Sequence, residues 1–184
     1  MMDRTQALAL VRTHIDNPNL VNHCVATEII MEALARHFEL PAADIERWAL
    51  TGLLHDLDYA QTAEDFDKHA VVTAEMLADE LDEEMLHAIL AHADKAPRES
   101  RMDIALFAAD PTTGFVVAAA LVRPDKSLAG VELRSLKKRW KEKAFARGAN
   151  REQMAACEDL GMTRDEFLQL ALDAMQGRAA DIGL

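Results

Sequence analysis

Four residues of this chain combine metal-binding chemistry with an apolar setting: His23, His55, Asp56 and Asp110. His55 and Asp56 end the apolar run in "LTGLLHDLDYA", and the other two interrupt apolar stretches elsewhere. Because a buried, unpaired charge is costly, such groups are usually neutralised, paired or bound to a metal. Imidazole nitrogens together with carboxylates suit Mn, Fe, Co, Ni or Zn. If the fold brings the four residues together, they form a candidate cation site.

The two isolated residues also have purely structural explanations. On a helix, His23 shares a face with Thr27 and Ile30, which suits a core histidine satisfied by protein partners. Asp110 precedes Pro111, a pair typical of a helix N-cap with proline at the first helical position. Alternatively, Asp110 projects into a site and Pro111 kinks the helix beside it. The sequence leaves both interpretations open.

Other histidines differ in how their predicted helices orient them. His69 begins one predicted helix, and His92 lies beside the apolar face of the next, so His92 is a candidate for a cleft. His87 points away from that apolar face and is expected at the surface. No Gly-rich phosphate loop is present, so an ATP-driven mechanism is not indicated.

Helices must position these residues, since the pattern is helical almost throughout. The chain has only 7 Gly and 5 Pro, and no segment alternates polar and apolar residues over the length of a strand. We therefore predict an all-α fold, a single compact helical bundle. The predicted helices cover residues 3–16, 20–38, 43–59, 67–80, 82–94, 100–121, 132–146, 150–160 and 164–181.

Several of these helix boundaries have chemical support. Asp67 and Asp82 are predicted N-caps, because each precedes an apolar run. The pairs Ser100–Asp103 and Thr163–Glu166 match capping boxes, in which the two residues satisfy each other's backbone N–H groups. The segment 122–130 is the clearest loop.

The chain length suits one structural domain in two parts. With 184 residues it can bury a real core. We expect residues 1–122 to form the helical core that carries the candidate site. Residues 123–184 are expected to form C-terminal helices that pack on this core.

Charge and composition exclude several classes of function. The net charge of −12 argues against binding to duplex nucleic acid or to an anionic membrane. Basic residues outnumber acidic ones between Arg123 and Arg147, which we interpret mainly as a solvated helix face. Neither a transmembrane helix nor a secretory signal is expected. Because Cys24 and Cys157 form no metal-type pair or disulfide framework, the predicted compartment is the reducing cytoplasm.

The order of the four candidate ligands resembles a known signature. His23, then His55–Asp56, then Asp110 is similar to the H…HD…D pattern of the HD-domain superfamily of metal-dependent phosphohydrolases. "LTGLLHDLD" and "ALFAAD" resemble the family's ligand-bearing segments, and "HCVAT" and "KHAVVTAEML" resemble neighbouring ones. The resemblance covers about residues 18–122 and comes closest to the small bacterial HDIG-type branch. It departs from that branch at Asp58, where glycine is usual, and in the proline that follows the last ligand.

This resemblance implies an all-α bundle with one or two divalent cations, drawn from Mn, Fe, Co, Ni, Zn or Mg. The implied ligands of the first cation are His23, His55, Asp56 and Asp110. Family members with two metals add histidines between the HD pair and the last aspartate. Here the histidines in suitable places are His69 and His92, as ligands of a second metal or as contacts for a substrate phosphate.

The implied reaction is hydrolysis of a phosphoester in a small molecule, commonly a nucleotide, by water whose pKa the metal lowers from 15.7 to about 7. Asp58, three residues from His55 on the same predicted helix face, is the predicted residue for proton transfer. The candidates for binding the substrate phosphate are Lys68, Lys95, Arg123 and Lys126. The sequence does not identify the substrate or the oligomeric state.

Two other functions are compatible with the same residues. One is a non-catalytic metal- or nucleotide-binding module, in which the site stabilises the bundle or senses a ligand. The other is a helical interaction protein whose buried polar groups merely pair with each other. A catalytic metal site keeps an open coordination position, whereas a structural site is saturated by protein ligands. Metal content and turnover therefore separate the three.

Overall fold

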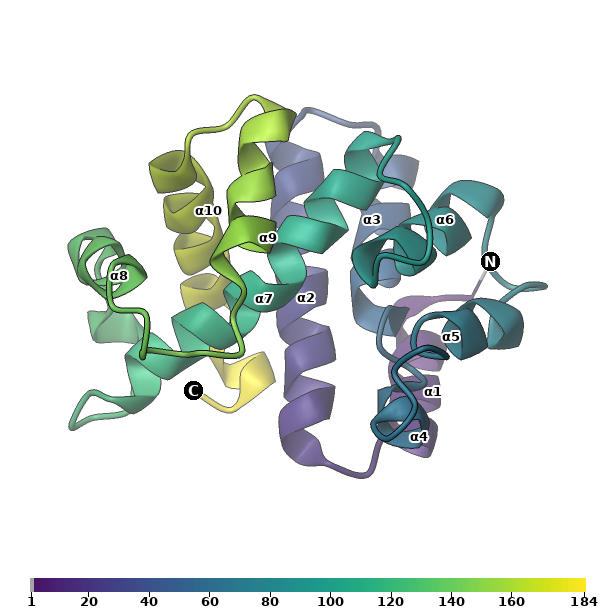
Figure 1. The fold of residues 1–184 in the computed structure, drawn as a ribbon, viewed down its shortest axis with the longest axis horizontal. Coiled ribbons are helices and arrows are strands. Elements are labelled where there is room, and N and C mark those ends of the chain that lie inside the picture. The colour runs from purple at the N-terminus through teal and green to yellow at the C-terminus, as the bar shows by residue number, and fades with distance from the viewer. Residues whose placement is uncertain (1) are drawn as a thin grey trace.

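The computed structural model describes residues 2–184, and helices joined by turns make up this whole range, with no strand in it (Figure 1). The all-α prediction is confirmed. The α-helices are α1 (Arg4–His14), α2 (Pro18–His37), α3 (Ala42–Leu54), α4 (Tyr59–Thr62), α5 (Val71–Met76), α6 (Glu83–His92), α7 (Arg101–Leu121), α8 (Leu133–Trp140), α9 (Arg151–Ala155) and α10 (Arg164–Gly177). Three short 3₁₀ segments are η1 (Leu128–Gly130), η2 (Ala156–Leu160) and η3 (Ala179–Ile182).

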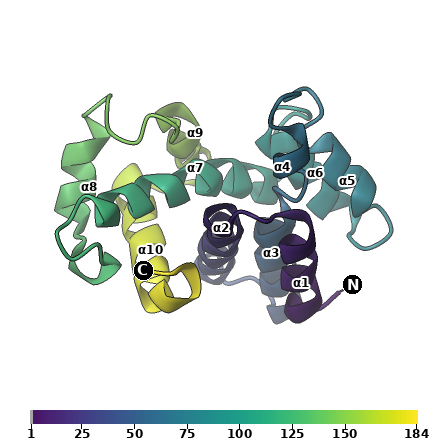
Figure 2. The same ribbon diagram turned by 90° about the horizontal axis from the view of Figure 1, so that it is seen from below.

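The helix α7 runs across the middle of the molecule and connects its two ends. Figure 2 shows α1, α2, α3 and α10 on one side of α7, with α4–α6 near its start and α8 near its end. By length and a mean hydropathy of 1.7, α7 could span a membrane, but 67% of that apolar window is buried inside the protein. Its apolar character is that of a central core helix, which places Asp110 near the centre of the fold.

The chemistry of the helix ends was partly predicted. Both capping boxes form as expected, Ser100–Asp103 at α7 and Thr163–Glu166 at α10, and Asp82 caps α6 by accepting the Met85 N–H. The prediction for Asp67 is wrong, because α5 begins four residues later. Ala70 precedes α5 with φ of +68°, a backbone conformation that breaks the helical path.

Three predicted helices are also too long. The predicted helix 43–59 ends at Leu54 and continues as turns before the short α4. The predicted helix 67–80 shrinks to α5, and the predicted helix 132–146 ends at Trp140. The turns next to α3 and α5 contain buried apolar residues such as Leu57, Ala70 and Leu77, so the apolar spacing continues past the helix ends and periodicity cannot distinguish these turns from helix. The turn after α8 is different, because residues 141–144 are exposed.

The two interpretations of Asp110 are resolved by the continuity of α7. This helix begins at Arg101, is capped by Ser100, and runs without interruption past Pro111 to Leu121. Asp110 is therefore an interior helical residue, and the N-cap interpretation is wrong. Its side chain is free to point away from the helix axis into the space between α7 and α2.

Close contact between α2 and α3 brings their polar residues together. Gly52 lies where these helices touch, and a Cβ at this position would meet the Met31 Cγ and the Thr27 backbone oxygen at 2.9 Å. Only glycine allows the two helices to approach this closely. The approach sets His55, which follows α3, opposite His23 on α2.

Candidate metal centre

His23 lies at the meeting point of three elements. Its Nε2 atom is 3.3 Å from the Nε2 of His55, 3.1 Å from Oδ1 of Asp110 and 3.4 Å from Oδ2 of Asp56. These residues come from α2, from α7 and from the turn that follows α3. The structure thus brings together all four of the ligands that the resemblance implied.

Asp56 connects this group to two further histidines. Its Oδ1 atom lies 3.4 Å from Nε2 of His69 and 3.5 Å from Nε2 of His92, while Oδ2 faces His23. The candidate ligand atoms of Asp56, His69 and His92 all lie within 4.8 Å of one another, as do those of His23, His55 and Asp56. Asp56 therefore belongs to two adjoining triplets and could bridge two cations. We call the six side chains the His/Asp cluster: His23, His55, Asp56, His69, His92 and Asp110.

The protonation of three cluster histidines follows from their outer hydrogen bonds. The Nδ1–H of His55 donates to the Gly52 carbonyl at 2.8 Å, and that of His92 donates to the Ile89 carbonyl. His69 Nδ1–H donates to Oδ1 of Asp58 at 2.9 Å. Carbonyl and ionised carboxylate oxygens can only accept, so Nδ1 carries the proton in each ring. Each Nε2 consequently presents its lone pair to the cluster.

His23 also carries its proton on Nδ1, where its hydrogen-bond partner is the hydroxyl group of Thr113. The Thr113 O–H donates to the Asp110 backbone carbonyl at 2.8 Å, which uses its single proton. Its oxygen can therefore only accept from His23 Nδ1–H, at 2.8 Å. Thr113 lies three residues after Asp110 on α7, so one helix turn supplies both a cluster carboxylate and the group that orients His23.

In the cluster, the Nε2 nitrogens of the histidines face one another and the carboxylate oxygens of Asp56 and Asp110. When His23 is neutral, four Nε2 lone pairs and two carboxylates converge, and the buried His92 Nε2 has no hydrogen-bond partner within residues 2–184. When His23 is protonated, its Nε2–H instead donates to Asp110 and Asp56. Burial disfavours the imidazolium of His23, but hydrogen bonds from it to Asp110 and Asp56 outweigh this and raise its pKa to about 10. Burial raises the pKa of Asp110, yet the neighbouring His23 and His55 lower it below its ordinary value. The arrangement attracts positive charge, as protons or as metal.

The donor set fits a divalent cation. Ligands bound about 2.1 Å from one ion lie about 3.0–3.4 Å apart in octahedral or tetrahedral geometry. The cluster distances of 3.1, 3.3 and 3.4 Å around His23 Nε2 fall in this range. A metal would also give the buried His92 Nε2 the partner that it otherwise lacks.

A comparison with protein families identifies the fold around this cluster. The family model for the HD domain matches residues 20–141 of the sequence, and this range includes every member of the cluster. The chain belongs to the HD-domain family. Neither curated proteins nor solved structures gave a match to the chain. The HDIG-type branch stays a prediction.

This HD domain exposes its cluster on one side only. The side chains of His55, His69 and His92 are at most 4% exposed, whereas those of His23 and Asp110 are 21% and 27% exposed. A small molecule can reach the cluster only past His23 and Asp110. The side formed by His69 and His92 is closed by protein.

Asp58 lies outside the cluster and orients His69 by a hydrogen bond. Its side chain is fully buried, and its two carboxylate oxygens accept from His69 Nδ1–H and from the Thr73 backbone N–H. It does not share a helix face with His55, because α3 ends before both residues. With both oxygens engaged and no solvent contact, Asp58 cannot exchange protons with a substrate. We therefore do not retain the predicted proton-transfer role.

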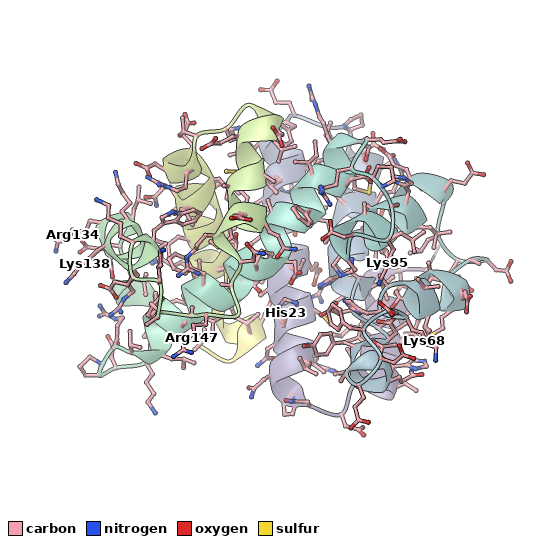
Figure 3. All side chains as sticks on the ribbon, viewed as in Figure 1. His23, Lys68, Lys95, Arg134, Lys138 and Arg147 are labelled. Atoms are coloured by element: carbon pink, nitrogen blue, oxygen red, sulfur yellow. The ribbon has the colours of Figure 1, made fainter. Side chains whose placement is uncertain are left out.

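The four predicted phosphate contacts separate into near and distant residues. Lys95 follows α6 three residues after His92; its side chain is 22% exposed, and its Nζ lies 4.0 Å from Oδ1 of Asp67. Lys68 adjoins His69 in sequence, but its side chain is 68% exposed and paired with Asp65. Figure 3 shows both lysines on the side of α4–α6.

The other two predicted phosphate contacts are not retained. Arg123 and Lys126 lie beyond the C-terminal end of α7, about 17 Å along that helix from Asp110. Arg123 is also paired with Asp125. The cations of the nearby α8 region, such as Arg134 and Lys138, lie on the opposite side of His23 from Lys95 in Figure 3.

Sequence reasoning missed the residues that orient the cluster from behind. Thr113, Thr73 and Gly52 each fix the position of a cluster residue or of Asp58, yet none belongs to the H…HD…D pattern. Only Thr113 had a sequence signal, its i+3 spacing from Asp110 on one helix face. His87, expected at the surface, is one-third exposed and hydrogen-bonded to the buried Asp103.

Proposed function

We propose that this HD domain is a metal-dependent phosphohydrolase that hydrolyses a phosphoester of a small molecule, with nucleotides among the candidate substrates. The observation that carries the proposal is the His/Asp cluster, in which imidazole nitrogens and carboxylate oxygens converge and the buried His92 Nε2 has no hydrogen-bond partner within residues 2–184. A purely structural metal site would need no open side, whereas this cluster is accessible past His23 and Asp110. A ligand-sensing module needs the same opening, so turnover is required to distinguish it from an enzyme.

The proposed ligands divide between two cations that share Asp56. His23, His55, Asp56 and Asp110 would hold the first, and Asp56, His69 and His92 would hold the second. A divalent cation in such a site makes water a better nucleophile at neutral pH and neutralises the charge that builds on a phosphoryl group. Nitrogen and carboxylate ligands of this kind suit several first-row ions.

The protein residues supply orientation and shielding. Gly52, Ile89 and Asp58 accept the Nδ1–H groups of three histidines and so keep each Nε2 lone pair aimed inward. The closed side around His69 and His92 excludes bulk water, which strengthens electrostatic interactions within the site. Lys95 is the proposed contact for a substrate phosphate.

Elemental analysis of the purified protein tests the metal site. We expect up to two equivalents of a transition metal in the wild type, and a loss of at least one equivalent in Asp56→Asn and in Asp110→Asn. Asp103→Asn is the matched control, because Asp103 is also a buried carboxylate on α7 bonded to a histidine, but lies outside the cluster. Wild-type protein that binds no Mn, Fe, Co, Ni or Zn after reconstitution would refute the proposal.

Turnover then distinguishes an enzyme from a binding module. The metal-loaded wild type is assayed for release of inorganic phosphate from phosphate monoesters and nucleotides. Phosphate release that disappears in Asp56→Asn, and persists in Asp103→Asn, supports the phosphohydrolase. Full metal content with no release from any ester would instead favour the non-catalytic module.

The net charge and the two cysteines support proposals about the partners and the cellular compartment of this protein. A net charge of −12 supports a small phosphorylated substrate and opposes duplex nucleic acid or an anionic membrane as partner. Cys24 and Cys157 are both free and buried, which suits the reducing cytoplasm that we propose as the compartment.

A further inference from the structure

A pocket lies against the open side of the His/Asp cluster. Its volume is about 360 Å³, within the lower range of small-molecule sites. His23 and Thr113 form the wall that the pocket shares with the cluster, and the other walls come from α2, α7 and the last residues of the chain. A molecule whose phosphate reaches the cluster past His23 would therefore place its remaining part in or beside this pocket.

The lining of the pocket carries no formal charge on its side chains apart from the titratable His23. Val117, Leu121 and Ile182 supply apolar surface, and no lysine, arginine, aspartate or glutamate contributes. Asn19 and Asn22 add two side-chain amides, neither of which makes a hydrogen bond within residues 2–184. Such a surface suits an uncharged group that is partly apolar and offers hydrogen-bonding atoms.

Gly114 stands out among the lining residues because packing does not require it. It lies inside α7, where glycine is less favourable than alanine. A Cβ at this position would meet no atom within 4 Å, unlike at Gly52, where the neighbouring helix fills that space. Gly114 is exposed and lines the pocket, so its missing side chain leaves room at the pocket wall next to Thr113.

We propose that this pocket receives the uncharged alcohol portion of the phosphoester and that Gly114 sets the largest alcohol that fits. Hydrolysis breaks the bond between phosphorus and the alcohol oxygen, joins the oxygen of water to phosphorus, and leaves the alcohol with a proton from that water. The inference rests on the proposed phosphohydrolase function and adds the class of leaving group to it.

The test compares Gly114→Ala and Gly114→Leu with the wild type on esters of graded size. The substrates are methyl phosphate, phenyl phosphate and 1-naphthyl phosphate, with 4-carboxyphenyl phosphate as the charged counterpart of the phenyl ester. Alanine and leucine both favour helix over glycine, so the variants are expected to fold. Gly177→Leu is the matched control, since Gly177 is also helical and its Cβ direction is also free.

We expect size-dependent losses in Gly114→Leu. A single methylene in an apolar pocket changes kcat/KM by about 10–200-fold. The value for 1-naphthyl phosphate should therefore fall at least about tenfold, mainly through KM, whereas methyl phosphate is hydrolysed as before. The alanine variant should lie between, and Gly177→Leu should match the wild type. The wild type should prefer phenyl phosphate to its carboxylated counterpart.

Other outcomes distinguish a failure of the pocket assignment from a failure of the proposed phosphohydrolase function. If Gly114→Leu lowers kcat/KM equally for all esters, or for none, the assignment of the pocket is overturned while the phosphohydrolase stands. Loss of metal in Gly114→Leu would also overturn it, because the residue would then support the cluster rather than the leaving group. If the metal-loaded wild type hydrolyses no phosphoester, the proposed function fails and this inference fails with it.

Discussion

Substitution of Asp58 by asparagine should disable one half of the cluster without touching a proposed ligand. Both partners of the Asp58 carboxylate are donors, the Nδ1–H of His69 and the backbone N–H of Thr73. Asparagine has one acceptor and one donor, and the Thr73 N–H cannot change its role. The asparagine NH₂ group therefore faces His69, whose Nδ1 must become an acceptor. The proton moves to Nε2, which removes the lone pair aimed at the cluster.

The size of the effect follows from the role of such supporting carboxylates. Loss of an orienting partner behind a metal-binding histidine typically weakens metal affinity about 10–100-fold. This equals about 1.4–2.7 kcal/mol. At a fixed excess of metal the bound state loses the same amount of stabilisation, and 1 kcal/mol shifts Tm by about 2–4 °C for a domain of this size. The Tm increase on adding metal should shrink by about 3–11 °C.

Calorimetric titration with Mn²⁺ or Zn²⁺ and thermal melts with and without metal measure this effect. Asp58→Asn should weaken one of two binding events and leave the other, assigned to His23, His55 and Asp110, unchanged. Asp103→Asn is the control, because Asp103 also accepts from a histidine Nδ1–H and from backbone N–H groups. It should lower Tm equally with and without metal.

Two results would refute this reasoning about Asp58. One is an Asp58→Asn protein with two unchanged binding events, which would mean that the tautomer of His69 does not control a metal site. The other is an Asp103→Asn protein with the same loss of affinity, which would assign the effect to general loosening of the fold.

Two further predictions concern residues that position the site, and a third concerns the control residue Asp103. Thr113→Val removes the acceptor for His23 and should weaken the first metal site about 10–100-fold by calorimetry, whereas Thr112→Val, which loses only a bond to the Ala108 carbonyl, should not. Gly52→Ala should lower the free energy of unfolding in urea by about 1–3 kcal/mol, since the added methyl group overpacks the contact between α2 and α3. Burial raises the pKa of Asp103, but bonds from Ser100 and Glu99 outweigh it and lower the pKa below 3.8. The ionised group therefore stabilises the fold above that pH and loses its contribution as the pH falls further, so the stability difference between wild type and Asp103→Asn should shrink between pH 6 and pH 3.

Much of the fold followed from local rules. Apolar spacing at helical period predicted an all-α chain, and paired polar residues at fixed spacing predicted where α7 and α10 begin. The H…HD…D order indicated the family, which the HD-domain match confirms. The helical spacing and the caps depend on residues within one or two helix turns of each other, so the sequence expresses them directly. The H…HD…D order spans residues 23–110 and is informative through the family resemblance.

Other features depended on contacts between distant segments. The capping interpretation of Asp110 was chemically sound, and only the continuity of α7 excludes it. Asp58 looked like a proton-transfer residue, but His69 in the turn before α5 and Thr73 in α5 occupy both of its oxygens. Arg123 looked like a phosphate contact because it begins a basic stretch, yet the length of α7 carries it away from the cluster.

The sequence by itself therefore indicated the all-α fold and the caps of α6, α7 and α10, because these are set by residue type and local spacing, and its resemblance to a known pattern indicated the candidate ligands. Tertiary structure decided which atom of each histidine faces the cluster, which side of the cluster is open, and that Gly114 leaves room beside it. These properties depend on which helices touch and how closely. In this chain, the approach of α3 to α2 at Gly52 and the unbroken path of α7 past Pro111 determine them.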